Sequence, residues 1–151
     1  MTPIQAQLTL LKTDITALWT LVISQLNKSL HSLKTFDKDF SREVVSKEKR
    51  VNSMELNIDR NCENIFALYN PVAIDLRFVL ATLKINSNLE RIGDFAEGIS
   101  KVIISEKHGF DPELLKVTRF FEMNQNAINI VKAVSAELQQ NNTKFARNTY
   151  I

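Results

Sequence analysis

The chain has 151 residues, of which 44% are hydrophobic, 24% charged and 8% aromatic, with only three Gly and three Pro. This composition is typical of a well-packed soluble domain and excludes a disordered or collagen-like chain. The 19 basic and 17 acidic residues are interleaved and leave a formal charge of +2, which argues against a surface built to bind nucleic acid.

The cysteine content and the N-terminal sequence indicate the cellular compartment of the protein. Cys62 is the single cysteine and can close no disulfide within the chain, and no Cys/His cluster has the spacing of a zinc site. The first residues lack the basic start and apolar run of a signal peptide, and no stretch approaches the ~18 apolar residues that span a bilayer. We therefore expect a cytoplasmic protein.

The first half of the chain predicts two long helices. Apolar residues recur at steps of three and four from about Gln5 to about Leu33, which is the period of an amphipathic helix. The segment from Thr35 to Asp39 then supplies capping side chains, and a second helix with one apolar face runs to about Tyr69.

The few Gly and Pro residues divide the second half. Asn70-Pro71 ends the second helix, and because proline fits the first turn of a helix, a third is expected from this proline until Gly109 provides a left-handed stop. Asp111 as N-cap, with Pro112 at the first helical position, opens a fourth helix that ends in the polar run 139–142.

These elements predict an all-α fold. Long helices joined by short loops pack antiparallel, so we expect an up-down antiparallel three-helix bundle in residues 1–108. Residues 109–151 form a fourth long helix, with packing of the spectrin-like or four-helix-bundle kind. The tail 143–151 has neither a C-cap glycine nor a charged end, which predicts a chain that is shortened or that finishes on a partner.

Oxygen-bearing side chains lie on the flank of the apolar face of the second helix. At 100° per residue they fall within about 60° of one another, and a similar group lies on the third helix. If the two helices form a hairpin, residues whose numbers sum to about 142 lie at equal height. The second-helix group is Glu48, Asn52, Glu55 and Asp59, and the third-helix group is Glu90, Asp94 and Glu97. Glu90 then faces Asn52, and Asp94 faces Glu48.

Two interpretations of this acidic groove remain open. Like charges so close repel unless a cation lies between them, and oxygen ligands suit Mg²⁺, Mn²⁺ or Fe, whereas the absence of histidine argues against a zinc hydrolase. The alternative, which spacing alone favours, is a solvated flank. Its neutralising side chains would be Lys47, Lys49, Arg50 and Arg91.

Two motifs on the expected third helix carry a family resemblance. The segment 70–77 reads Asn-Pro-Val-Ala-Ile-Asp-Leu-Arg, and the segment 89–97 contains Glu-Arg-Ile-Gly-Asp. In this order and spacing they resemble PhoU, the phosphate-signalling regulator of bacteria. The resemblance is specific over about Asp37 to Ile103 and weaker in the first and fourth helices.

The resemblance implies a three-helix bundle repeated twice, with Asp/Glu-x-x-x-Asp metal motifs. It implies a cytosolic accessory protein, not an enzyme, that links the ATPase of the phosphate ABC transporter to a membrane sensor histidine kinase. Such a protein represses phosphate uptake and the phosphate-starvation response. The motifs carry over to Glu90 with Asp94 and to Glu48 with Asn52, where Asn52 departs from the commoner Asp.

The resemblance favours the interpretation of the acidic groove as a metal site. Its candidate ligands hold a divalent or iron cation (Fe, Mn, Mg or Zn), and no organic cofactor is expected. These ligands are Glu48, Asn52, Glu55, Asp59, Glu90 and Asp94.

The chain has room for one bundle plus a fourth helix, which resembles the opening helix of the second repeat. Its apolar seam at Phe121, Ile128, Val131 and Leu138 predicts a homodimer in which the fourth helices pack against the other subunit. Contact with a membrane is expected only through partners.

Asp75 and Arg77 open the third helix. They are explained equally well as a partner contact and as helix-end electrostatics with a local ion pair.

Two further protein classes remain as alternatives to the regulator. A ferritin-like carboxylate metalloenzyme would need Glu-x-x-His pairs, which do not occur here. The other alternative is a helical adaptor without a metal role, attached to a different phosphate or ion transporter.

Overall fold

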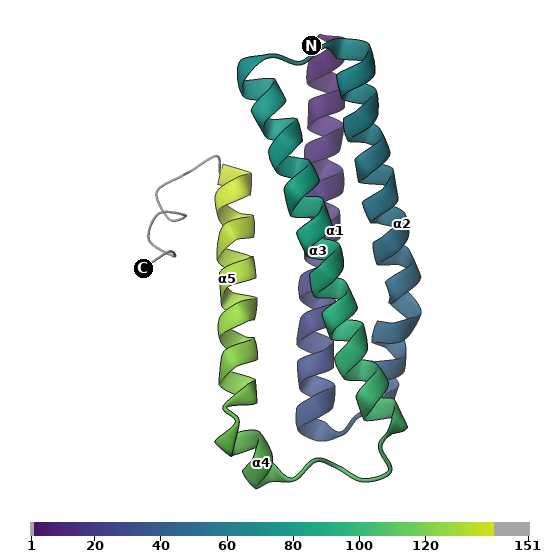
Figure 1. The fold of residues 1–151 in the computed structure, drawn as a ribbon, viewed down its shortest axis with the longest axis vertical. Helices are drawn as coiled ribbons and strands as arrows, with labels where there is room; N and C mark the ends of the chain where they lie inside the picture. The colour runs from purple at the N-terminus through teal and green to yellow at the C-terminus, as the bar shows by residue number, and fades with distance from the viewer. Residues whose placement is uncertain (1, 141–151) are drawn as a thin grey trace. The chain divides into compact units, whose positions relative to one another are not determined.

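The computed structural model describes residues 2–140, and the predictions made for the tail beyond residue 140 lie outside it. The regular elements in this range are all α-helices, which confirms the all-α prediction (Figure 1). They are α1 (Pro3–Thr35), α2 (Lys38–Tyr69), α3 (Ala73–Ser105), α4 (Pro112–Val117) and α5 (Phe120–Gln140). Among the described residues, no helix has the length and apolar character that crossing a bilayer requires.

The chain divides into two compact units, and the division passes through α1, α2 and α3. The first unit consists of Met1–Val22 and Lys47–Asp94, and the second of Ile23–Ser46 and Phe95–Ile151. The domain boundary expected between residues 108 and 109 stays a prediction.

The first unit is an antiparallel arrangement of three helical segments, one each from α1, α2 and α3 (Figure 1). The apolar stripes that the periodicity predicts face inward and form its core, because burying them removes their surface from water. Completely or almost completely buried are Leu11, Ile15, Leu18, Val51, Ile58, Cys62, Ile65, Val79 and Leu89. A polar contact joins α2 to α1, where the Asn61 amide donates to the Asp14 carboxylate at 3.2 Å.

The register of α2 against α3 in this unit agrees with the prediction. The buried amide of Asn86 donates to the backbone carbonyl of Glu55 at 2.9 Å, and Gly93 lies against Val51. Both pairs have residue numbers that sum to within a few units of 142, as expected for a hairpin of two straight helices.

The second unit has its own core and polar links. Its buried apolar side chains include Leu26, Leu33, Val44, Ala96, Ile103 and Ile128. The buried amide of Gln25 donates to the backbone carbonyl of Val44 at 2.7 Å, which joins α1 to α2. The Lys38 ammonium donates to the backbone carbonyls of Ile104 and Glu106, so a side chain from the start of α2 caps the end of α3.

Helix α1 ends in a Schellman-type turn made by a residue other than glycine. Phe36 adopts φ 55°, and the Asp37 backbone N–H donates to the Ser32 carbonyl at 3.2 Å. The Asp37 carboxylate in turn accepts from the backbone N–H groups of Asp39 and Phe40. The capping role predicted for the segment from Thr35 to Asp39 is therefore confirmed, with Asp37 as the N-cap of α2.

Two expectations about Pro and Gly were wrong. Pro71 does not lie in the first turn of α3, because the helix begins two residues later, at Ala73, which itself takes φ 49°. Gly109 is not the left-handed stop of α3. The helix ends earlier, at Ser105, where Lys38 satisfies its terminal carbonyls, and among the described residues no glycine has a positive φ.

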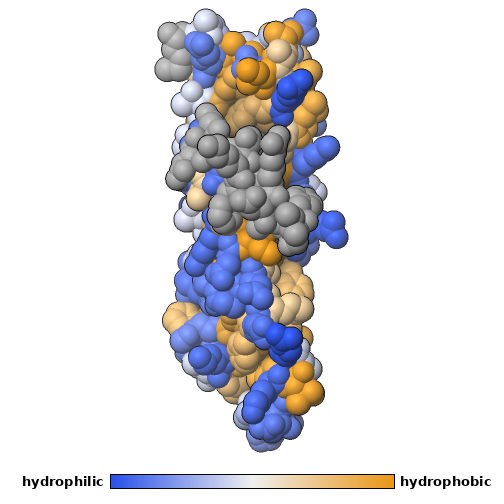
Figure 2. Space-filling model, turned by 90° about the vertical axis from the view of Figure 1, so that its left-hand side faces the viewer, coloured by the Kyte–Doolittle hydropathy of each residue, from blue (hydrophilic) through white to orange (hydrophobic). Residues whose placement is uncertain are grey.

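The expected fourth helix is interrupted. Asp111 caps α4 as predicted, since its carboxylate accepts from the Glu113 N–H at 2.9 Å and Pro112 follows at the first helical position. At Arg119, φ is 51° and the helix breaks before α5. Hydrophobic residues are exposed around the break, among them Val117 at 77%, and Figure 2 shows such patches among hydrophilic residues in the lower part of the view.

The two mid-helix glycines of α3 give a test of the packing. A Cβ on Gly93 would lie 3.1 Å from Val51 Cγ1, whereas a Cβ on Gly98 would meet nothing within 4 Å. We expect Gly98→Ala to raise the Tm by about 1–3 °C, because alanine is favoured over glycine by about 0.5–1 kcal/mol in a helix. Gly93→Ala should show no gain or a loss. Equal gains in thermal melts of both variants would contradict the close contact.

Candidate functional site

The acidic groove of the first unit is formed where α2 approaches α3 at Gly93. Glu48 is only 5% exposed, and a Cβ added to Gly93 would lie 3.6 Å from its Oε2 and 3.9 Å from its Oε1. The Glu48 carboxylate therefore lies beside the α3 backbone at Gly93, at a distance at which a Cβ would be in ordinary van der Waals contact with it. Glycine at this position, adjacent to Asp94, is explained by helix packing.

Asn86 is the polar link within the groove. It is completely buried, and besides its bond to the Glu55 carbonyl its amide donates to Asp59 Oδ1 at 2.8 Å. This bond orients the Asp59 carboxylate and occupies one of its oxygens. Sequence reasoning missed Asn86, although its position four residues before Glu90 places it on the same stripe of α3.

The pKa of Glu55 is raised above its ordinary value. Burial contributes most, since it disfavours the charged carboxylate, and the negative charges of Asp59 and Glu90 add to it. Glu55 and Asp59 belong to α2, whereas Glu90 belongs to α3, so acidic residues from the two helices act on one another across the groove.

The pKa of Glu90 is raised as well. Burial is again the main cause, followed by the negative charge of Asp94 and by a hydrogen bond between the two carboxyl groups, while Arg91 acts in the opposite direction. Two carboxylates this close repel each other, so positive charge between their oxygens would stabilise the pair.

The predicted ligands are thus only partly brought together. Glu48 is buried beside Gly93, while Glu55, Asp59 and Glu90 are half-buried, and Asn52 and Asp94 are exposed. Within residues 2–140, no three His, Cys, Asp or Glu side chains converge closely enough to hold a metal ion as they stand. The set of six remains a prediction.

Three other residues considered from the sequence also have defined positions. Asp75 is half-buried and Arg77 exposed at the start of α3, and in the part of the chain that the structure describes they form no ion pair with each other. Cys62 is completely buried, and burial raises the pKa of its thiol to about 12. It is therefore a core residue, because neither a nucleophile nor a metal ligand forms readily from a thiol that is protonated at neutral pH.

The protein-family model that matches the chain is the PhoU domain, over residues 15–103. The chain belongs to the PhoU family. The match covers the segments of α2 and α3 that form the acidic groove, including both stripes of oxygen-bearing side chains.

Curated PhoU relatives support this membership. The chain is 38% identical over 101 residues to the phosphate-specific transport system accessory protein PhoU of Edwardsiella tarda, and 34% identical over 101 residues to that of Escherichia coli. It is 32% identical over 113 residues to PhoU homolog 1 of Thermotoga maritima. These matches cover 67–74% of the chain but only 42–49% of the relatives, so the chain spans less than half the length of each.

A solved PhoU structure has the same fold. The phosphate transport system regulatory protein PhoU from Streptococcus pneumoniae superposes with a TM-score of 0.76 at 25% identity, over 89% of this chain and 62% of that one. The predicted helical bundle with a further helix is therefore confirmed as a PhoU fold.

The raised pKa of Glu90 gives a pH test. A carboxyl whose pKa is higher in the folded than in the unfolded state contributes stability below its ordinary pKa of 4.5, and this contribution is lost as the pH rises through the folded pKa. Because glutamine mimics the protonated form, Glu90→Gln should raise the Tm near neutral pH in EDTA, by roughly 1–2 °C for a domain of this size.

The gain should vanish at a pH below 4.5, where Glu90 is itself protonated. Glu63→Gln, an exposed glutamate on the same helix as Glu55, serves as the control and should change the Tm little at either pH. A lower Tm of Glu90→Gln at neutral pH would contradict the repulsion inferred for the groove.

Proposed function

We propose that the chain acts as a PhoU-type regulator of phosphate homeostasis, and the observation that carries the proposal is the PhoU domain match over residues 15–103. The relatives named above are accessory proteins of phosphate-specific transport systems. In this proposal the chain is not an enzyme. It is a cytoplasmic protein that works by contacts, linking the ATPase of a phosphate ABC transporter to a sensor histidine kinase and repressing phosphate uptake.

The solvent exposure of side chains suggests which surface makes these contacts. Arg77, with Asp75, lies at the start of α3 beside two strongly exposed apolar residues, Val72 at 72% and Ile74 at 79%. An exposed apolar tip next to charged side chains is typical of a protein contact.

A homodimer through the fourth helical segment remains part of the proposal, but a different set of residues supports it. Ile128 of the predicted seam is buried in its own unit at 1% exposure. A different apolar stripe stays exposed on α5, with Met123 at 57%, Ile130 at 49% and Val134 at 37%. Its spacing of seven and four residues gives a face that can pack against a second α5.

Copurification tests the regulatory role. The tagged chain, expressed at native level in its host, should retain the ATPase of the phosphate transporter or a sensor kinase, identified by mass spectrometry. An Asp75→Ala/Arg77→Ala variant should retain at least about tenfold less. Retention of a different transporter's ATPase instead would favour a helical adaptor, a role with which the neutral and exposed Asn52 agrees.

We also propose that the acidic groove binds a divalent or iron cation. The support is the charge arrangement of the groove: Asp94 lies beside Glu90, and Glu55 lies across from them, with the pKa values of both glutamates raised by burial and by neighbouring negative charges. A cation would supply positive charge between these carboxylates. The side chains proposed to hold it are Glu90 and Asp94 with Glu55, and then Glu48, Asn52 and Asp59.

Elemental analysis of protein purified without a histidine tag tests the metal proposal. The protein should hold Fe, Mn, Mg or Zn at a fixed stoichiometry, and Glu90→Ala/Asp94→Ala should lose it with nearly unchanged helical circular dichroism. The control pair Glu63→Ala/Glu106→Ala removes two exposed acidic residues outside the groove and should keep the metal. Unchanged metal content in the groove variant would remove these residues from the site.

A further inference from the structure

The second unit carries a groove between α1 and the segment that includes α4 and α5. Two hollows of about 540 Å³ each adjoin there, since both are lined by Lys34, Phe121 and Glu122. One extends toward Phe36 at the end of α1 and the other toward Asn27, two turns earlier. We call these two adjoining hollows the α1–α5 groove.

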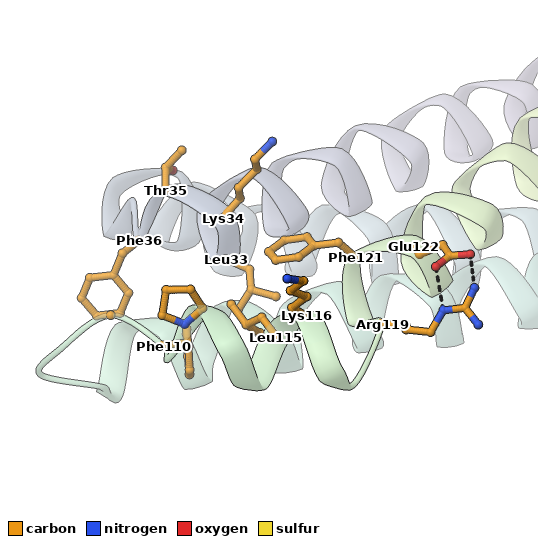
Figure 3. A pocket seen from close by; sticks show the side chains of 12 residues that line it. Leu33, Lys34, Thr35, Phe36, Phe110, Leu115, Lys116, Arg119, Phe121 and Glu122 are labelled. Atoms are coloured by element: carbon orange, nitrogen blue, oxygen red, sulfur yellow. Dashed lines mark hydrogen bonds and ion pairs between the residues drawn. The ribbon is translucent and has the colours of Figure 1, made fainter.

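The floor of the α1–α5 groove is apolar and aromatic. Leu33 of α1 and Leu115 of α4 lie opposite each other in Figure 3, and Phe121 covers them from the start of α5. At one end Phe36 and Phe110 pack edge to face, with ring centroids 6.1 Å apart. Large aromatic and leucine side chains in a depression are typical anchors for an apolar side chain of a partner.

The rim of the groove is basic. Lys34 and Lys116 line it from α1 and α4, and within residues 2–140 neither ammonium forms a hydrogen bond or ion pair. The third cation, Arg119, is bound to Glu122 by a two-point contact drawn in Figure 3. One arginine and two lysines against one glutamate leave the rim with two uncompensated positive charges.

The length of the groove fits a short helical segment. Along α1 it extends from Asn27 to Thr35, which is about 12 Å at 1.5 Å per residue. This equals about two turns, so it accommodates apolar side chains at i, i+3 or i+4 and i+7 of a bound helix. The two free lysines at its edge then meet side chains on the outer flanks of that helix.

We propose that the α1–α5 groove binds an acidic amphipathic helix of another protein. The apolar face of that helix lies on Leu33, Leu115 and Phe121, and its carboxylates pair with Lys34 and Lys116. This deepens the proposed regulatory role, because it defines the chemistry of one partner. Residues 141–151 of the chain itself are a poor match in charge, since they contain Lys144 and Arg147 and no acidic residue.

A synthetic peptide tests the proposal without reference to any phosphate-dependent partner. The probe is a 16-residue helical peptide with leucine at i, i+3 and i+7 and glutamate on its flanks, labelled with fluorescein. Its counterpart has lysine in place of each glutamate. Binding to the full chain is measured by fluorescence anisotropy at low and high NaCl, because ion pairs at an exposed rim weaken with salt.

We expect the acidic peptide to bind at micromolar concentration, and to bind at least about tenfold more weakly to Lys34→Glu/Lys116→Glu and in high salt. The matched control Lys49→Glu/Lys84→Glu makes the same charge change at exposed sites of the first unit and should bind as the unaltered chain does. The basic peptide should not bind.

Three results would overturn the groove proposal: no binding of the acidic peptide, equal binding to both charge-reversed variants, or equal binding of the basic peptide. Circular dichroism of each variant excludes unfolding as the cause of a loss. A negative peptide result together with retained transporter ATPase in the copurification leaves the regulatory role in place and removes only the groove. Binding of the acidic peptide without retention of the transporter ATPase would contradict the phosphate role and support the groove proposal.

Discussion

The close approach of α2 to α3 at Gly93 is the constraint on which the first unit depends. With a Cβ there, Val51 Cγ1 would be only 3.1 Å away, so the two helices pack at this distance because the side chain is absent. The same approach encloses the Glu48 carboxylate, which is 5% exposed. Asn86 holds the register two turns away through its bonds to α2. The packing that stabilises the helices therefore also concentrates negative charge between them.

This concentration of charge couples the packing of the helices to ions in solution. In the folded chain the Glu55 and Glu90 carboxyls have raised pKa values, so ionising them costs more than in the unfolded chain and weakens the contact of α2 with α3. Anything that binds the ionised groove and not the unfolded chain restores that stability by mass action. Protons and any bound cation would then compete for the same oxygens.

The sequence predicts features that depend on one helix, or on two helices of known direction. Periodicity places α1, α2 and α3 to within a few residues, and the rise per residue predicts the register that Asn86 and Glu55 show. The helix ends were harder, because tertiary partners and not local residues settle them. Lys38 terminates α3 from the start of another helix, and Phe36 takes a left-handed φ that glycine adopts more readily. Asn86 escaped notice because its partners lie 27 and 31 residues away.

The break at Arg119 has a consequence that a continuous helix could not provide. In one straight helix, residues 115 and 121 would point about 120° apart, because six residues turn the helix by about 600°. Since α4 ends at Val117 and α5 begins at Phe120, both Leu115 and Phe121 line one hollow opposite Leu33. A left-handed φ is unfavourable for a residue with a side chain, so the turn at Arg119 costs free energy. The two-point contact of Arg119 with Glu122 offsets little of this cost, because both side chains are exposed. A continuous α4–α5 would thus be the less strained solution for stability alone. The turn places apolar side chains and Lys116 along the same groove, which favours a role in binding a partner over a role in holding the fold together.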